Sequence, residues 1–356
     1  MQNQQLATSN WQLHVAAACK IAVVSSVQPV FLCHRIFGGK HLEAVNIRRR
    51  RLDGVEHAKG WIGMSEAISR RKFLAGAAVA AGGFSAVPAR IRGQEDFVPK
   101  TVADGIPLVD FHAHLDRVIT LEKALEISTK RGVKFGIVEH AGTKENKYPN
   151  LISDDEGLLR YMAMLEGKPV YKGIQAEGLD WPTCFSKEVV ARLDYVLSDA
   201  LTFPEKNGRR VRLWLANEVR IDDKQDFMER YTDFNVAVIA REPIDILANP
   251  TFLPGFLRNE HDALWTPERM GRIIDAAVKH NVAIEINSGF RLPRLAFLAL
   301  AKRAGARFSF GSNIHGPDVG KMDYCLEMVK ALGLKRADMF SPAPRGKKPI
   351  EIRTFA

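Results

Sequence analysis

The feature that most constrains the fold is a regular alternation of short apolar runs and amphipathic segments from Phe97 onward. The apolar runs lack the in–out polarity of a half-exposed sheet, so they are typical of parallel strands covered on both faces. The segments between them repeat apolar residues at helical spacing. Seven strands are expected, at residues 107–115, 135–138, 170–176, 195–197, 244–248, 282–286 and 308–310. Seven strand–helix units predict the α/β class.

Local signals mark several helix ends and one turn. Gly132 closes the helix that starts near Leu121, and Thr266 followed by Pro267 combines a capping hydroxyl with a proline in the first turn. Residues 154–156 are acidic and suit the start of another helix. Further helices are expected over residues 187–192, 224–240, 294–304 and 320–332. An Asn-Gly pair within residues 203–214 predicts a hairpin, which either covers the mouth of the fold or is a plain insertion.

Polar residues with metal-binding side chains lie at the carboxyl ends of nearly all predicted strands. They are His112, His114, His140, Glu177, Asp199, Asn249, Asn313 and His315. In a (β/α) barrel the carboxyl ends of all strands meet at one pocket, whereas an open sheet uses only a few strand ends. Residues two apart on a strand also share a face. The pattern therefore predicts a closed or nearly closed, distorted seven-stranded barrel similar to a TIM barrel, with one polar pocket.

The residue types in this pocket indicate a divalent metal ion. Residues 90–356 hold six histidines, and four of them lie at strand ends. Imidazole and carboxylate groups bind zinc, manganese or iron, and such an ion activates water for hydrolysis. Asn249 and Asn313 are read either as weak oxygen ligands or as groups that orient the imidazoles. Glu139 and Glu285 are expected to face away from the pocket and to be structural.

Residues for catalysis and substrate binding are less evident. Asp199 is a candidate for catalysis as well as for the metal. A phosphate ester needs a cation near the metal, and Arg117, Lys144 and Arg291 each follow a pocket strand. The other interpretation is that these are solvated loop charges. The expected partner is a small-molecule substrate.

The strand-end motifs resemble those of the polymerase and histidinol phosphatase (PHP) family of metal-dependent phosphoesterases, in order and spacing over residues 108–334. The motifs are Asp110-Phe-His112-Ala-His114, Glu139-His140, Gly173-Ile-Gln-Ala-Glu177, Asp245-Ile-Leu-Ala-Asn249-Pro250, Glu285-Ile-Asn287 and Asn313-Ile-His315. The resemblance implies a distorted seven-stranded barrel and phosphoester hydrolysis at a metal centre.

Three positions depart from the family pattern. Asn249 stands where the family has a histidine, Asn313 where it has an aspartate, and Asp199 near a further family histidine. A neutral amide is a weaker ligand than a carboxylate or an imidazole. The resemblance, corrected for these changes, implies one or two metal ions rather than three.

Two other functions are compatible with the sequence. Amidohydrolases also begin with His-x-His on the first barrel strand, but that superfamily adds a lysine on the fourth strand and an aspartate on an eighth. Here the fourth strand offers Asp199, and no eighth strand is predicted. The second alternative is a degenerate barrel that binds a metal or ligand without turnover, and the two asparagines favour it.

The N-terminal part has the features of an export signal. Ser69-Arg70-Arg71 precedes an apolar run and then the small residues Val87-Pro88-Ala89, which predicts a twin-arginine (Tat) signal at residues 64–89. The other reading is a short buried helix with basic flanks. Residues 1–63 are interpreted as a non-native or disordered extension, and residues 97–340 as the barrel domain. The expected location is periplasmic or secreted, through the Tat export machinery, without stable membrane insertion after cleavage.

This division changes the meaning of the net charge. The whole chain has 51 basic and 41 acidic residues, a formal charge of +10. Residues 1–89 hold 11 of the basic and 4 of the acidic residues, which leaves 40 basic and 37 acidic residues for the remainder, +3. The basic excess belongs mainly to the predicted signal and extension, so nucleic acid is not an expected partner. Cys184 and Cys325 remain after residue 89, too few for a disulfide framework.

Overall fold

The computed structural model describes residues 97–354. The predicted extension at residues 1–63 and the predicted signal at residues 64–89 lie outside the described residues and stay predictions. Among the described helices, none has the length and apolar character needed to cross a membrane. Cys184 and Cys325 are free thiols.

All seven predicted strands are present and form one parallel sheet whose spatial order follows the chain. They are β3 (Val109–His114), β4 (Lys134–Val138), β6 (Tyr171–Glu177), β7 (Tyr195–Ser198), β10 (Ile246–Leu247), β11 (Ala283–Asn287) and β12 (Phe308–Gly311). A short additional strand, β5 (His140–Gly142), pairs with β6 beside β4. The order agrees with a strand–helix repeat in which each strand joins the sheet next to the one before it.

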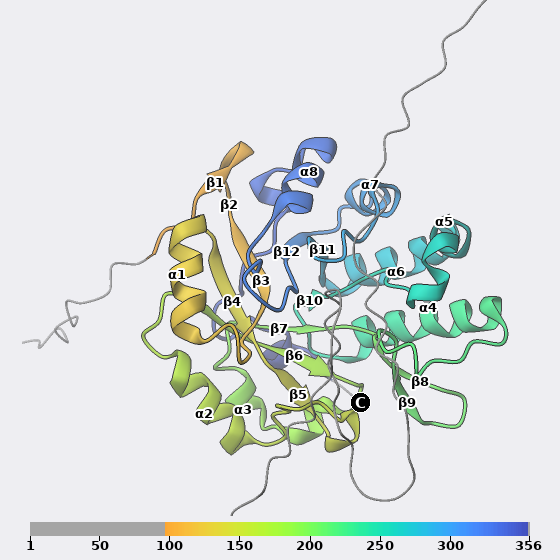
Figure 1. Cartoon of the computed structure of the whole chain (residues 1–356), viewed down its shortest axis with the longest axis horizontal. Helices are drawn as coiled ribbons and strands as arrows, with labels where there is room; N and C mark the ends of the chain where they lie inside the picture. The colour runs from red at the N-terminus through yellow and green to blue at the C-terminus, as the bar shows by residue number, and fades with distance from the viewer. Residues whose placement is uncertain (1–96, 355–356) are drawn as a thin grey trace, which may run out of the picture. The chain divides into compact units, whose positions relative to one another are not determined.

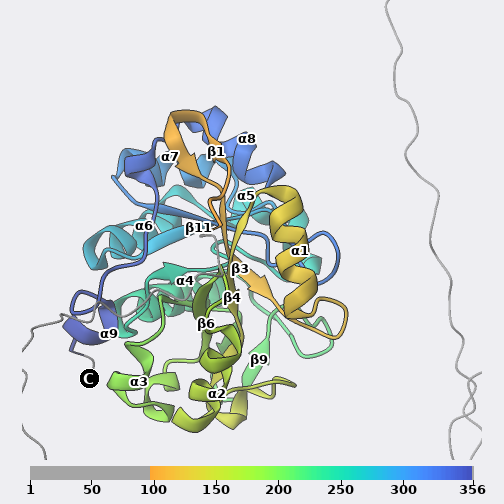
Figure 2. The same cartoon turned by 90° about the vertical axis from the view of Figure 1, so that its left-hand side faces the viewer.

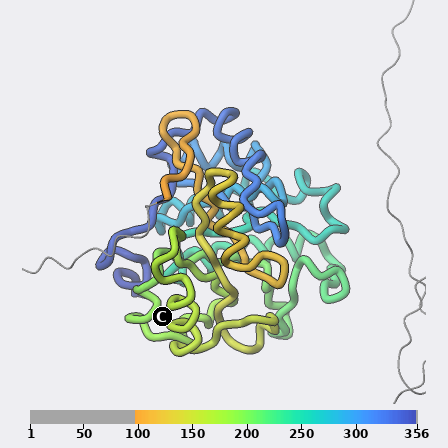
Figure 3. Tube along the Cα trace, turned by 60° about the vertical axis from the view of Figure 1, so that its left-hand side comes forward, coloured from red at the N-terminus to blue at the C-terminus, as the bar shows by residue number. Residues whose placement is uncertain are grey.

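The first and last strands, β3 and β12, lie side by side, which nearly closes the sheet. The backbone nitrogen of Asn313 donates to the carbonyl oxygen of His112 at 2.9 Å. The Asp110 carboxylate accepts from the backbone nitrogen of Ser312 at 2.9 Å and from its hydroxyl at 2.6 Å. Figure 1 shows orange β3 next to blue β12, and the tube in Figure 3 shows orange and blue parts of the chain side by side from another direction. The α/β prediction of a distorted, nearly closed seven-stranded barrel is confirmed.

Helices surround the strands on the outside, as the two cartoon views show (Figures 1 and 2). They are α1 (Leu121–Arg131), α2 (Asp155–Leu165), α3 (Lys187–Val190), α4 (Lys224–Arg241), α5 (His261–Leu264), α6 (Pro267–His280), α7 (Leu295–Arg303), α8 (Asp323–Leu332) and α9 (Pro349–Ile352). The predicted caps are present: the Thr266 side chain accepts from the Arg269 nitrogen, and Gly132 ends α1 at φ 70°. Glycine adopts this left-handed conformation without steric cost.

Two short hairpins complete the fold. The strands β1 (Thr101–Val102) and β2 (Ile106–Pro107) pair before the barrel begins. The strands β8 (Thr202–Pro204) and β9 (Arg210–Arg212) pair across the predicted Asn-Gly turn. The second hairpin leaves the barrel directly after β7, so it stands beside the carboxyl ends of the strands.

The end of the barrel at which the strands begin, called its lower half below, is filled by aromatic side chains. Phe111 packs against Tyr171, Tyr195 and Phe340 with ring centroids 5.1–5.5 Å apart. The Tyr195 hydroxyl donates to the Phe111 carbonyl at 2.7 Å, which satisfies its one polar group. The Tyr195 ring lies directly on the backbone of Gly136 and Gly173, in the space that a side chain on β4 or β6 would need. These two strands therefore require glycine.

We expect Gly173→Ala to lower the free energy of unfolding by about 1–3 kcal/mol, because the added methyl group overlaps the Tyr195 ring in a closely packed interior. The matched control is Gly271→Ala on α6, where the added methyl group meets open space. The control should gain about 0.5–1 kcal/mol, since glycine is unfavourable inside a helix. Denaturant unfolding measures both, and equal stability of the two variants would contradict this packing.

A second prediction concerns Asp245, which is buried and accepts from the Val196 backbone nitrogen at 2.9 Å. Burial raises the pKa of Asp245 from 3.8 to about 7. The folded protein therefore holds a proton that the unfolded chain releases near pH 4. This contribution to stability is present in full below pH 4 and is lost, at roughly 1.4 kcal/mol per pH unit, as the pH rises toward 7.

Asp245→Asn removes this titration and keeps an acceptor for Val196. Between pH 4 and pH 7 the variant should therefore gain stability relative to the unmodified protein, and above pH 7 the difference should stay constant. Thermal unfolding across this pH range measures the stability difference between the two proteins. The control is Asp275→Asn, which changes an exposed aspartate on α6. A difference that is independent of pH would show that Asp245 is ionised in the fold.

Candidate metal centre

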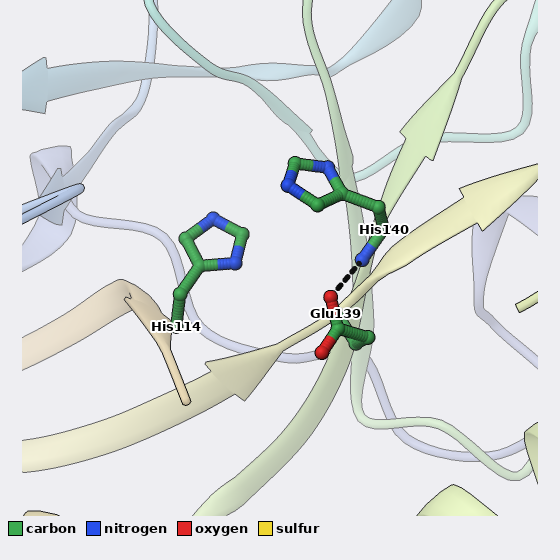
Figure 4. Close-up of side chains that lie close together, drawn as sticks. All are labelled: His114, Glu139 and His140. Carbon is green, nitrogen blue, oxygen red and sulfur yellow. Dashed lines mark hydrogen bonds between the residues drawn. The ribbon is translucent and has the colours of Figure 1, made fainter. Parts of the chain in front are cut away.

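Three side chains at the carboxyl ends of β3 and β4 are close enough to share one metal ion. His114 ends β3, Glu139 follows β4 and His140 begins β5. One ligand atom from each lies within 4.8 Å of the other two. Figure 4 shows the two imidazole rings and the carboxylate gathered at the strand ends. Imidazole and carboxylate are ligand types of zinc, manganese and iron sites, so the donor set fits such an ion.

A break between β4 and β5 explains why the neighbouring residues Glu139 and His140 both reach the candidate metal position. β4 ends at Val138 and β5 begins at His140, so the alternation of faces along a strand does not run through Glu139. The Glu139 carboxylate turns back and accepts from the His140 backbone nitrogen at 3.0 Å. The prediction that Glu139 faces away from the pocket is wrong, because it assumed one continuous strand.

His140 is held in a defined orientation by its neighbours. Its Nδ1 lies 2.9 Å from an oxygen of Glu177, whose other oxygen accepts from the Thr202 hydroxyl at 2.8 Å. The ring of Tyr148 stacks on the imidazole, with centroids 3.9 Å apart. A histidine that binds a metal through Nε2 usually gives its Nδ1 proton to a carboxylate. Glu177 supplies this carboxylate, so the Nε2 atom of His140 is the one that faces an ion.

His114 stands between His140 and His315. Its ring is 4.9 Å from that of His140 on one side and 4.9 Å from that of His315 on the other. Its Nε2 lies 2.9 Å from the amide oxygen of Gln175, which leaves Nδ1 for an ion. The side chain of His315 is 56% exposed, and its Nδ1 lies 3.8 Å from Asp116. His315 is therefore at the solvent edge of the cluster.

Burial sets the charge of these groups. It lowers the pKa of His140 to about 4 and, together with the neighbouring histidines, lowers the pKa of His114 well below its usual value. Both rings are therefore neutral near pH 7, which is the form that binds metals. Burial also raises the pKa of Glu177 to about 8 and that of Asp199 to about 7. A nearby cation favours the ionised form of such carboxylic acids.

Deeper in the barrel, six buried side chains form a closed ring of hydrogen bonds. In order around the ring they are His112, Gln175, Asp199, Asn249, Asn287 and Glu285. They come from β3, β6, β11 and the ends of β7 and β10, so the ring spans five of the seven strands. We call this set the amide ring, because three of its members are amides.

The Glu285 carboxylate anchors one side of the amide ring. One oxygen lies 2.7 Å from Nδ1 of His112, and the other accepts from the backbone nitrogen of Asn249 at 2.7 Å and from Asn287 at 3.1 Å. Burial opposes both charges, but each partner stabilises the other: the pKa of His112 is raised and that of Glu285 is lowered. The prediction that Glu285 faces away is wrong, because Glu285 and Asn287 share the inner face of β11.

The two asparagines that depart from the family pattern are bonded to each other and to the ring. The Asn249 oxygen accepts from Asn287 at 2.9 Å and from Asn313 at 3.1 Å. Asn249 and Asn313 also have φ values of 48° and 44°. Asparagine tolerates this left-handed region better than most residues, which gives a backbone reason for its presence at both strand ends.

Sequence reasoning missed two residues of the site. Gln175 contacts His112 and His114, and it precedes Glu177 by two positions on β6, so the same-face rule could have found it. Tyr148 lies in the loop after β5, where nothing in the sequence indicated contact with a histidine. The β8–β9 hairpin stands close by, since Trp214 packs 5.8 Å from Tyr148.

The two arginines predicted for substrate binding occupy different places. Arg117 is exposed and lines a hollow of about 380 Å³ together with Glu139. Arg291 forms an ion pair with Glu327 at 2.6 Å and lies over the Tyr324 ring, at the wall of a separate cavity of about 550 Å³. Of the two arginines, only Arg117 lines a hollow together with one of the three candidate metal ligands, Glu139.

Comparisons with known proteins include a similar solved structure, a phosphatase. No protein-family profile and no curated protein matches the sequence. The structure is a histidinol phosphate phosphatase from Lactococcus lactis subsp. lactis Il1403, complexed with zinc, L-histidinol and phosphate. The sequences are 15% identical, the match covers 69% of this chain and 99% of the other, and the TM-score is 0.45.

Proposed function

We propose that this protein is a metal-dependent hydrolase whose ion is held by His114, Glu139 and His140. The observation that carries the proposal is the approach of their ligand atoms to within 4.8 Å at the mouth of the barrel. Three protein ligands with further positions left open are typical of catalytic rather than structural metal sites. When bound, the ion lowers the pKa of a water molecule and polarises the scissile group.

The residues around the three ligands prepare them for this role. Glu177 and Tyr148 fix the His140 ring, so little orientation is lost when an ion binds. The Gln175 amide and the neighbouring imidazoles hold His114 in place. His315, half exposed beside His114, is placed to contact a substrate or to complete the ligand set from the solvent side.

The proposed substrate class is a small phosphoester. The order of strand-end motifs, which resembles that of the PHP phosphoesterases, supports this class. Arg117 supports it further, because it lines the same hollow as Glu139 and makes no ion pair with any described residue. A guanidinium group binds two phosphate oxygens at once. Arg291, which is already paired with Glu327, is the weaker candidate.

A non-catalytic metal-binding barrel is the second candidate, and the amide ring favours it. Neutral side chains and buried, mutually bonded carboxylates fill the inner part of the pocket. The amidohydrolase alternative gains no comparable support, since the described barrel has seven main strands with only the short β5 added beside β4, and β7 is followed by Asp199 rather than a lysine. Turnover, rather than metal content, separates the first two candidates.

We expect a chelator to abolish phosphoester hydrolysis and added Zn²⁺, Mn²⁺ or Fe²⁺ to restore it. His114→Ala should lower kcat/KM by at least about 100-fold, because an activated water contributes several kcal/mol of transition-state stabilisation. His280→Ala, at the end of α6, is the control and should keep the activity. The assay uses phosphomonoesters, phosphodiesters and amides. Hydrolysis that survives both the chelator and His114→Ala would rule out this site.

We further propose that the protein is exported by the Tat pathway and begins near Arg90 after cleavage. The twin arginines, the apolar run and the small residues before Arg90 support this proposal. Changing Arg70 and Arg71 to lysine should leave the precursor in the cytoplasm. The control changes Arg48 and Arg49 to lysine, in a run outside the predicted signal. Fractionation with immunoblotting measures export, and normal export of the first variant would refute the proposal.

A further inference from the structure

The amide oxygen of Gln175 occupies the point between the two histidines of the His-x-His motif. It lies 2.9 Å from Nε2 of His112 and 2.9 Å from Nε2 of His114. Gln175 is almost completely buried, as are both histidines. A metal ion held by both Nε2 atoms would stand about 2.0–2.1 Å from each of them, in the same space. The protein's own amide therefore fills the inner metal position.

Asp199 fixes which end of the Gln175 amide faces the histidines. The Gln175 nitrogen donates to an oxygen of Asp199 at 3.1 Å, and the same oxygen accepts from the Asn249 amide at 2.8 Å. A flipped amide would set its oxygen against the Asp199 oxygen and lose this hydrogen bond. The oxygen of Gln175 therefore faces the imidazoles, and both Nε2 atoms must carry protons to bond to it.

This arrangement excludes metal coordination by His112. A ligating nitrogen needs a free lone pair, but Nε2 of His112 donates to Gln175 and Nδ1 donates to Glu285. His114 is different, because only its Nε2 is engaged and Nδ1 remains for the outer ion. The His-x-His pair looks like a chelating motif in the sequence. In the structure His112 belongs to the amide ring, and His114 belongs to the metal centre.

The remaining groups of the amide ring are bonded to neighbouring protein groups and are not open to a second ion. The inner carboxylates, Asp199 and Glu285, each accept hydrogen bonds from side-chain amides of the ring and from a backbone nitrogen, that of Leu201 or Asn249. The other inner groups are neutral amides that are bonded to one another. Removing such groups from their partners leaves buried polar atoms unpaired, which costs about 1–3 kcal/mol for each.

We infer that Gln175 closes the inner position, so that the centre holds a single ion at His114, Glu139 and His140. This inference rests on the proposed metal-dependent function. By this inference, Gln175 is the residue that determines how many ions the centre binds. The divalent ion is expected at the outer position, where His114 and His140 each use one ring nitrogen for a neighbouring side chain and keep the other for the ion.

The number of ions is measured on the full chain after loading with Zn²⁺ or Mn²⁺ and removal of excess metal. Elemental analysis should give about one ion per chain, and the Mn²⁺ form should show the electron paramagnetic resonance spectrum of an isolated ion. Two ions per chain, or an exchange-coupled Mn²⁺ pair, would overturn the inference and leave the proposed function standing. No bound ion would overturn both.

A variant should open the inner position. Gln175→Ala removes the amide, and Asn313→Asp adds a carboxylate at a backbone conformation that aspartate also tolerates. The double variant should bind about two ions per chain, with the matched control Gln225→Ala on α4 still binding one. A folded double variant that still binds one ion would show that Gln175 is not what excludes the second.

A spectroscopic test needs no variant and covers the case in which the double variant fails to fold. Long-range ¹H–¹⁵N spectra of histidine rings are recorded while the unmodified protein is titrated with Zn²⁺. The signals of His114 and His140 should shift, whereas both ring nitrogens of His112 should stay protonated. Loss of the His112 Nε2 proton on Zn²⁺ binding would overturn the inference.

Discussion

The amide ring is the interaction on which the upper half of the barrel depends. Its buried side chains come from strands that are far apart in the sequence, and each of its amides both donates and accepts. Hydrogen bonds of this kind strengthen one another in a medium of low polarity, and an unpaired member is costly there. The ring therefore fixes the relative positions of five strand ends. These positions determine how close His114 and His140 lie to each other.

The barrel interior is divided into layers with different chemistry. Aromatic rings around Phe111 and Tyr195 fill the lower layer and exclude water. The amide ring forms the layer above, and the histidine cluster with Glu139 forms the rim. At the rim, His114 bonds to Gln175 through Nε2 and His140 to Glu177 through Nδ1, so each ring has a second nitrogen available for an ion. An ion at this level is held by residues that the layers beneath keep rigid, which is the support that a preorganised site requires.

The sequence predicts the framework well and the pairing of side chains poorly. Apolar runs, capping residues and glycines report local preferences, so strand and helix positions followed from them. The gathering of polar strand ends followed from the closed barrel. Gln175, Glu139 and Glu285 were missed or misplaced for another reason. Whether a buried polar group binds an ion or a neighbouring side chain depends on distances across the barrel, and a strand break such as that at Glu139 shifts the facing of residues.

The junction of β3 with β12 has a consequence for the order of folding. Asp110 and Ser312 are separated by 202 positions, and His112 and Glu285 by 173. The three rim ligands are synthesised early and lie within 26 positions of one another, from His114 to His140. Contacts between distant parts of a chain form late and slowly. A nascent chain therefore exposes its ion-binding side chains well before the strand that closes the wall around them has been made.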